Sequence, residues 1–249
     1  MISPLAYIHP EAKIGENVEI GPFCYIDRGV EIGDNNTLMN SVTILYGARI
    51  GSGNIFFPGS VIGAIPQDLK FRGEETICVI GDKNKIREYV TINRGTASKG
   101  QTLVGSGNLL MEGCHIAHDD IIGNDIIIGN CTKLAGEVTI DDHAILSACV
   151  LVHQFCRIGS YTMIGGGTRF SQNIVPYSIT AREPALYCGL NIVGRIVGKN
   201  VFVKRQDPVS VAIDVAGGDN HRIGHIRVER IAEGERLAVS GVFRRSRIQ

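Results

Sequence analysis

The sequence predicts an all-β protein in which short strands coil into a parallel β-helix, and three features of the chain support this. An aliphatic or aromatic residue recurs every six positions from Ile8 to Phe170, and only Asp68, Glu74 and Ser98 break this phase. Glycine often follows the recurring residue, and a small or apolar residue often stands two positions before it. A period of six fits neither a helix of 3.6 residues per turn nor two-residue alternation. The pattern therefore indicates strands that turn every six residues, with glycine at many corners.

Three such strands would close one coil of a triangular prism. Residues 18 apart in the sequence would then lie above one another, at the strand spacing of about 4.8 Å. The three-sided cross-section and the left-handed sense belong to the known hexapeptide-repeat architecture and do not follow from the period itself. Coils with two sides are the alternative.

The phase is lost twice without any change in the register that follows, and each loss predicts a loop leaving the wall. The first loop covers about residues 64–79 and the second about residues 93–103. Long ordered loops on a rigid scaffold often carry binding residues, although two insertions without a function are the alternative. We expect the β-helix to span residues 1–190 and a different segment to follow.

The segment that follows, residues 191–249, differs in charge from the rest. From Arg195 to Gln249 there are eleven Lys and Arg against six Asp and Glu, whereas the whole chain has 25 of each kind. Valine and isoleucine alternate along part of it, without a helical stripe. We expect a basic C-terminal segment that is unlike the β-helix.

The composition argues against several other classes of protein. The seven cysteines are scattered without a CxxC pair, which argues against disulfides and a thiolate zinc site and predicts that they are small buried residues. The amino terminus has no signal-peptide pattern, and no apolar run could span a bilayer. We therefore expect a cytoplasmic protein without stable membrane insertion and without a nucleic-acid partner.

The stretch Cys114–Asp119 holds two histidines and a carboxylate near the middle of the repeat. In the phase of the coils Ile116 points inward, His115 points outward and His118 follows the corner. Residues at intervals of 18 place His118, Gly136 and Gln154 in one column. Asp119 would stack on Glu137 and His153 would lie beside Gln154, so the column gathers polar groups at one corner.

A histidine whose neighbour one coil away is a glycine suits acyl transfer. The imidazole can act as general base on a bound hydroxyl, and the glycine N–H can face the negative charge that develops. A zinc site of the γ-carbonic anhydrase type is one alternative, but the columns of His115 and His118 continue into Lys133 and Gly136, which are poor zinc ligands. Two further alternatives are histidines that only hydrogen-bond at corners and a β-helix that serves as a non-catalytic scaffold.

Several motifs resemble the acyl-[acyl-carrier-protein]:UDP-N-acetylglucosamine O-acyltransferases of lipid A biosynthesis, over about residues 1–194. They are Gln67-Asp68-Leu69-Lys70-Phe71, Thr91-Ile92-Asn93-Arg94-Gly95-Thr96, Asn108-Leu109-Leu110-Met111, His115-Ile116-Ala117-His118-Asp119, Leu134-Ala135-Gly136, His153-Gln154-Phe155-Cys156 and Gly189-Leu190-Asn191-Ile192. The resemblance implies transfer of a 3-hydroxyacyl group from acyl carrier protein to the glucosamine 3-hydroxyl of UDP-N-acetylglucosamine. It further implies a homotrimer with active sites between subunits and no resident cofactor, because the acyl group arrives on the phosphopantetheine of acyl carrier protein.

The resemblance also implies a role for individual residues. His118 would be the general base, and the Gly136 N–H would stabilise the oxyanion. The other residues that it places in the site would contact substrate: Asp68, Asp119 and His115 the glucosamine, with Gln67 beside them in the same motif; Lys70 a phosphate; His153 and Gln154 the acyl and nucleotide groups; Asn191 the nucleotide; and Gly166 the floor of the acyl groove.

The chain departs from the family in two ways. Asn93 and Glu137 stand where many members have histidine. Beyond Gly194 the family continues into a basic stretch and a helical domain, which this sequence does not match. We hypothesise a shifted reading frame, because Val201–Gln206 can be back-translated so that a shift of one nucleotide yields Phe-Ser-Ser-Lys-Asp, which resembles the family. An authentic basic extension is the alternative, and sequencing the gene distinguishes the two.

Overall fold

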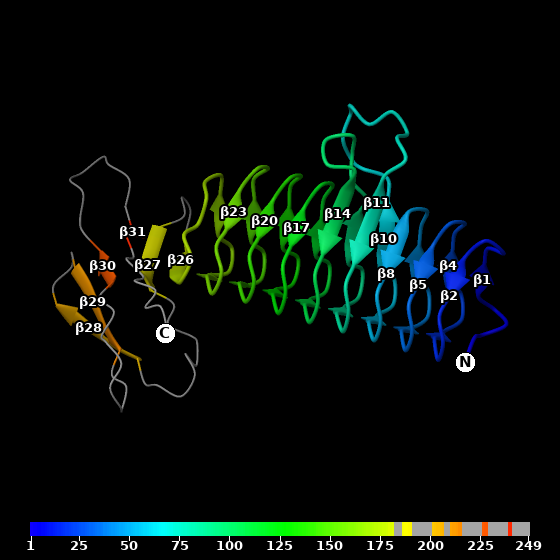
Figure 1. The fold of residues 1–249 in the computed structure, drawn as a ribbon, viewed down its shortest axis with the longest axis horizontal. Helices are drawn as coiled ribbons and strands as arrows, with labels where there is room; N and C mark the ends of the chain where they lie inside the picture. The colour runs from blue at the N-terminus through cyan, green and yellow to red at the C-terminus, as the bar shows by residue number, and fades with distance from the viewer. Residues whose placement is uncertain (182–185, 191–200, 207–209, 216–225, 229–238, 241–249) are drawn as a thin grey trace, which may run out of the picture. The chain divides into compact units, whose positions relative to one another are not determined.

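The computed structural model describes residues 1–181, 186–190, 201–206, 210–215, 226–228 and 239–240. The chain divides into two compact units, Met1–Asn191 and Ile192–Gln249. In the first unit short strands follow one another around three sheets, so that each sheet takes every third strand of the repeat (Figure 1). This arrangement is a parallel β-helix with three sides.

The strands of the three sheets have the following bounds. The first sheet contains β1 (Tyr7–Ile8), β4 (Tyr25–Ile26), β7 (Thr43–Ile44), β10 (Val61–Ala64), β13 (Thr91–Asn93), β16 (His115–Ile116), β19 (Lys133–Leu134), β22 (Leu151–Val152) and β25 (Arg169–Phe170). The second contains β2 (Lys13–Ile14), β5 (Glu31–Ile32), β8 (Ala48–Ile50), β11 (Ile77–Ile80), β14 (Gln101–Val104), β17 (Ile121–Ile122), β20 (Thr139–Ile140) and β23 (Arg157–Ile158). The third contains β3 (Glu19–Ile20), β6 (Thr37–Leu38), β9 (Ile55–Phe56), β12 (Lys85–Ile86), β15 (Leu109–Leu110), β18 (Ile127–Ile128), β21 (Ile145–Leu146), β24 (Met163–Ile164), β26 (Ser178–Ala181) and β27 (Leu186–Leu190).

The strand register confirms the predicted coil length. Tyr7 pairs with Tyr25, and His115 pairs with Lys133, so partners are 18 residues apart. The interval grows to 30 between Val61 and Thr91 and to 24 between Thr91 and His115, because a loop is inserted in each of these coils. The pairing of side chains therefore continues unchanged beyond both loops.

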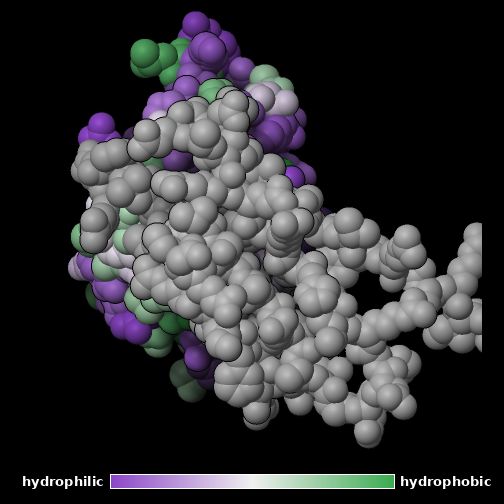
Figure 2. Space-filling model, turned by 90° about the vertical axis from the view of Figure 1, so that its left-hand side faces the viewer, coloured by the Kyte–Doolittle hydropathy of each residue, from purple (hydrophilic) through white to green (hydrophobic). Residues whose placement is uncertain are grey.

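Both loops are shorter than the sequence predicts. β10 ends at Ala64 and β11 begins at Ile77, while β13 ends at Asn93 and β14 begins at Gln101. The backbones of the loops meet at their bases, where Gly95 N donates to Ile77 O at 3.1 Å. The parallel ladder thus extends further into each insertion than the hydrophobic phase alone reveals. The loops project from one side of the coils, at the top of Figure 1. At the top of Figure 2, which is turned about the vertical axis, hydrophobic residues stand among hydrophilic ones.

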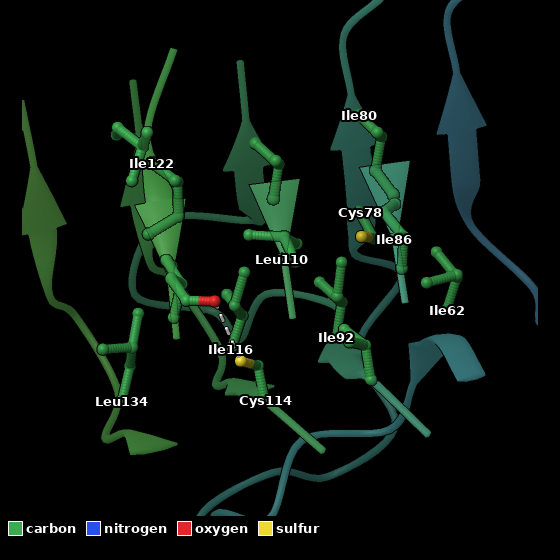
Figure 3. Close-up of a cluster of buried hydrophobic side chains, with 14 of the residues drawn as sticks. Ile62, Cys78, Ile80, Ile86, Ile92, Leu110, Cys114, Ile116, Ile122 and Leu134 are labelled. Atoms are coloured by element: carbon green, nitrogen blue, oxygen red, sulfur yellow. Dashed lines mark hydrogen bonds between the residues drawn. The ribbon is translucent and has the colours of Figure 1, made fainter. Parts of the chain in front are cut away.

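The recurring aliphatic residues form one continuous core along the axis of the coils. Figure 3 shows part of it, with Ile92, Leu110 and Ile116 pointing into the space between the sheets. These three side chains are fully buried. Only Ile8 and Ile14, in the first coil, are partly buried. The phase read from the sequence therefore identifies the inward face.

The prediction that the cysteines are buried is wrong for two of those that the structure describes. Cys131 and Cys149 are exposed, and both have φ of 58°. They occupy the third position after an inward residue, where the chain turns the corner in the left-handed region. A corner side chain points away from the core, which the hydrophobic character of cysteine does not reveal.

Buried asparagines connect the coils at another corner. Asn36, Asn54, Asn84 and Asn108 are at most 1% exposed. The Asn54 backbone N–H and Nδ2 both donate to Asn36 Oδ1, at 2.8 and 3.0 Å, and Asn84 bonds to Asn54 in the same way. The side-chain oxygens of Asn36 and Asn54 therefore accept hydrogen bonds from the asparagine of the next coil, so these buried polar groups have partners.

In the second unit the described residues form one antiparallel sheet, in the order β28 (Val201–Gln206), β29 (Ser210–Val215), β30 (Ile226–Val228) and β31 (Val239–Ser240). The rest of the predicted basic segment lies outside the described residues. No helix long and apolar enough to cross a membrane occurs in the described part of the chain.

Candidate active site

The corner after β16 places a histidine against a carboxylate. His118 Nδ1 lies 2.8 Å from Asp119 Oδ2, and the His118 side chain is 19% exposed. Asp119 takes the left-handed corner conformation with φ of 62°. Asp tolerates this region better than most residues do. An ionised carboxylate accepts the Nδ1–H of a neutral imidazole, which leaves the Nε2 lone pair free to take a proton.

The Asp119 carboxylate is fully buried and bonded on both oxygens. Thr96 donates its backbone N–H to Oδ1 at 3.0 Å and its hydroxyl to Oδ2 at 2.6 Å. Burial by itself raises the pKa of Asp119, but the hydrogen bonds from Thr96 and His118 outweigh it, so the pKa lies below the ordinary value. The group is therefore held as a carboxylate beside the imidazole.

The second loop is fastened onto this corner. Lys99 donates its backbone N–H to Asp119 Oδ1 at 3.2 Å and its ammonium to Asp119 O at 3.0 Å. Ser98 Oγ donates to Glu137 Oε1 at 3.2 Å, and the Lys99 ammonium lies 3.9 Å from Glu137. Glu137 thus ties the loop to the coil of Gly136.

Gly136 lies directly beside the imidazole, as the column of residues 18 apart predicts. A Cβ atom at Gly136 would stand 2.5 Å from both Cε1 and Nε2 of His118. The Gly136 carbonyl accepts the N–H of Phe155 at 3.2 Å, whereas its own N–H has no acceptor among the described residues. Only glycine at this position lets the ring approach the coil this closely.

His115 lies on the outer face of β16, as predicted, and is half-buried. Its Nδ1 lies 2.7 Å from the hydroxyl of Thr91 on the preceding coil. Burial, followed by the charges of Lys133 and His118, lowers the pKa of His115. The ring is therefore biased toward its neutral form.

The first loop carries Gln67, Asp68 and Lys70. Gln67 and Lys70 are exposed, whereas Asp68 is half-buried and accepts the backbone N–H of Lys70 at 2.9 Å. The loop is held at its base by Asn93, which is 2% exposed and donates from Nδ2 to Ile65 O. Asn93 therefore supports the loop from within the wall.

His153 and Gln154 lie two coils beyond His118 and are both exposed. Gly166 is elsewhere, because it follows β24 of the third sheet whereas His118 follows β16 of the first. One chain does not bring the Gly166 corner and the His118 corner together. Asn191 lies outside the described residues.

Several contributors to this corner were given no role from the sequence, among them the residues of the second loop that bond to Asp119 and Glu137. Thr96 bonds to the Asp119 carboxylate, and Thr102 accepts the Asp119 backbone N–H at 2.8 Å. Thr96 lies in the loop between β13 and β14, so no interval of the repeat predicts its contact with Asp119. Among the described residues no group of three or more His, Cys, Asp or Glu could hold a metal ion.

Known proteins resemble this chain over most of its length. An acyl-[acyl-carrier-protein]–UDP-N-acetylglucosamine O-acyltransferase from Aliarcobacter butzleri is 44% identical over 207 residues, which cover 83% of this chain and 78% of the relative. The enzyme of the same name from Myxococcus xanthus is 44% identical over 206 residues, covering 82% of this chain and 79% of the relative.

Solved structures agree with these relatives. A UDP-N-acetylglucosamine acyltransferase from Bacteroides fragilis is 69% identical with a TM-score of 0.77, covering 78% of this chain and 76% of that one. A structure from Acinetobacter baumannii is 42% identical with a TM-score of 0.76, covering 77% and 74%. The predicted fold class, a left-handed parallel β-helix, is thereby confirmed.

A family model described as the GMPPB C-terminal domain matches residues 2–104. This match ends before His115 and His118, so it concerns the repeat and not the candidate site. The matches to the enzymes from Aliarcobacter butzleri and Myxococcus xanthus cover more than 200 residues each, so they include the candidate site as well as the coils. The chain therefore belongs to the family of acyl-[acyl-carrier-protein]–UDP-N-acetylglucosamine O-acyltransferases.

Proposed function

We propose that this protein transfers a 3-hydroxyacyl group from the thioester of acyl carrier protein to the glucosamine 3-hydroxyl of UDP-N-acetylglucosamine, the first step of lipid A biosynthesis. The observation that carries the proposal is the His118 imidazole, bonded to the buried Asp119 carboxylate at 2.8 Å and seated against Gly136. Family membership supports the reaction, and this geometry supports the roles that we propose for the individual residues.

The first step is attack by the sugar hydroxyl. His118 Nε2 accepts the hydroxyl proton while the sugar oxygen forms a bond to the thioester carbonyl carbon. A general base of this kind contributes about 10²- to 10⁴-fold in rate. Asp119 holds the Nδ1–H side and stabilises the imidazolium that forms. We assign Asp119 this orienting role because its carboxylate is fully buried, and the glucosamine contact implied for it stays a prediction.

The second step is collapse of the tetrahedral intermediate. Its oxyanion would accept the Gly136 N–H, which is uncommitted among the described residues. The carbon–sulfur bond then breaks, and the phosphopantetheine thiolate takes the proton back from His118. The cycle regenerates the neutral imidazole and requires no resident cofactor.

Substrate contacts are proposed for the side chains around this corner. Lys70, exposed on the first loop, would meet a phosphate, with Gln67 and Asp68 beside it at the sugar. His115, fixed by Thr91, would contact glucosamine. His153 and Gln154, exposed two coils on, would line the acyl and nucleotide groups. Asn191 would reach the nucleotide.

A homotrimer is proposed because the site needs two corners. Gly166 is exposed, and an added Cβ there would lie 3.2 Å from Ala148 O, so a side chain would fill the surface beside it. It follows a strand of a different sheet from His118. Neighbouring chains that set one Gly166 corner against one His118 corner would complete the acyl groove.

The test is acyl transfer with purified protein, UDP-N-acetylglucosamine and a series of 3-hydroxyacyl carrier-protein thioesters. His118→Ala should lower the rate by about 10²-fold or more while circular dichroism and the oligomeric state stay unchanged. Full activity of His118→Ala, or wild-type protein that transfers none of the thioesters, would refute the proposal. The series also reports the preferred chain length.

A further inference from the structure

The parallel ladder of the first sheet is interrupted at the corner that carries His118. In other coils the residue after the inward one donates its N–H to the inward carbonyl of the next coil, as in Asp27 to Ile44 at 2.9 Å and Ala135 to Val152 at 3.0 Å. Ala117 holds the same position but donates to a side chain instead, Asp120 Oδ2 at 3.0 Å. The register between β16 and β19 accordingly stops at His115.

Asp120 spans the interruption. Its Oδ2 accepts from Ala117, the residue before His118, and its Oδ1 accepts from Val138 N at 2.8 Å, two residues after Gly136. The side chain is fully buried. A single carboxyl group therefore joins the backbone that carries the imidazole to the backbone that carries the glycine.

The chemistry of the position requires a group that accepts on both sides. Asn108, at another corner, accepts Ile126 N at 2.8 Å and donates from Nδ2 to Gly123 O at 3.0 Å. Around Asp120 both neighbours are N–H donors, so the amide nitrogen of an asparagine would face one of them without an acceptor. Two acceptor oxygens therefore suit Asp120, where the ladder is interrupted and two N–H groups need acceptors. One acceptor and one donor suit Asn108, where the ladder continues.

The environment of Asp120 changes the pKa of its carboxyl group. Burial raises the pKa of Asp120 well above its ordinary value, opposed by the N–H groups of Val138 and Ala117 and by the charge of Lys99, while Asp119 adds to the rise. A buried acid beside the acid that orients His118 is costly for the fold. Its placement is explained by the gap that it closes.

We propose that Asp120 is a positioning residue for acyl transfer: its carboxyl replaces the missing ladder bond and sets the distance between the His118 ring and the Gly136 N–H. This inference rests on the proposed function, because the distance matters only if these two groups act together. The Asp120 side chain is fully buried and bonds only to backbone N–H groups, so it would act through Ala117 and Val138 and not by contact with substrate.

The test compares Asp120→Asn with Asn36→Asp, a reverse change at the same position of the repeat and in a coil far from His118. Asn36 Nδ2 donates to Gly33 O and Gly51 O, so its acid variant also loses buried bonds. We expect both variants to melt earlier than wild type. Only Asp120→Asn should lower kcat, by about tenfold, with less than a twofold change in KM for UDP-N-acetylglucosamine, since small misplacements of reacting groups lower rates steeply.

A second readout does not depend on activity. The NMR resonances of the His118 ring, assigned with His118→Ala, should shift in Asp120→Asn and stay in place in Asn36→Asp. If Asp120→Asn does not fold, Asp120→Thr replaces it, because Thr102 occupies the equivalent position one coil earlier, directly before the paired residues Leu103 and Ile121. Unchanged kcat together with unchanged His118 resonances would overturn the inference. Wild-type protein without transfer activity would refute the proposed function, and the resonances alone would then decide the role of Asp120.

Discussion

Gly136→Ala tests whether the close approach of a ring and a glycine matters for function. The structure places the added Cβ 2.5 Å from Cε1 and Nε2 of His118 and 3.0 Å from Nδ1. Carbon atoms and their neighbours pack best at about 3.5 to 4.0 Å, so the ring must retreat by about 1 Å. Gly136 is not among the glycines with positive φ, so alanine itself suits the backbone. The expected damage is therefore confined to the imidazole.

The size of the effect follows from this displacement. A shift of about 1 Å in a catalytic group can cost about 10²-fold in rate, or about 2.7 kcal/mol of transition-state stabilisation. The ring is partly exposed, at 19%, and can swing outward by giving up its 2.8 Å contact with Asp119. We therefore expect kcat to fall about 10²-fold, with a small change in the melting temperature.

Steady-state transfer assays and thermal unfolding measure these quantities, and His118→Ala supplies the control background. Without the imidazole there is nothing for the new methyl group to strike, so Gly136→Ala should change neither the stability nor the residual rate of His118→Ala. If Gly136→Ala alone keeps kcat within twofold of wild type, the assignment of this pair as base and oxyanion donor is refuted.

Three further predictions follow from the same contacts. Asp119→Asn should keep the fold but lower kcat by about 10²- to 10⁴-fold, since it removes the charge that orients His118; a rate within tenfold of wild type would contradict the orienting role. His115 has a lowered pKa, so it stabilises the fold above its unfolded pKa, and this stability is lost as the pH falls toward the folded pKa. Between about pH 7 and pH 5 the melting temperature of wild type should therefore drop more than that of His115→Gln, and equal drops would show that the ring is not shielded. Asn54→Leu should lower the free energy of unfolding by about 1–3 kcal/mol for each buried partner left unsatisfied, measured by denaturant unfolding, and an unchanged midpoint would show that water replaces the lost bonds.

The hydrophobic phase was sufficient to predict the core and the stacking of the site. Ile116 lies inside, and His118 lies against Gly136, because a side chain in this fold is positioned by its place in a six-residue repeat. Repeats contact only their neighbours, so counting along the chain gives spatial neighbours directly. The regular part of the site could therefore be read without coordinates.

The irregular parts could not be read this way. The second inserted loop changes the interval from 18 to 24, and the bonds of its residues Thr96 and Lys99 to Asp119 have no counterpart in the repeat. The hydrophobic character of cysteine likewise did not distinguish a corner residue such as Cys131 from a buried one such as Cys114, although their places in the repeat differ. These positions depend on where the loops and corners place each group.

The sequence by itself determined the coiled fold, its inward face and the column that pairs the base with its glycine, because those follow from local periodicity. Only the tertiary structure decided that Asp119 is buried against His118 and that Asp120 replaces a bond of the ladder. A backbone N–H can be satisfied by a carbonyl one coil away or by a carboxylate nearby. Which of the two it takes depends on the distances that folding sets, and the order of residues does not contain them.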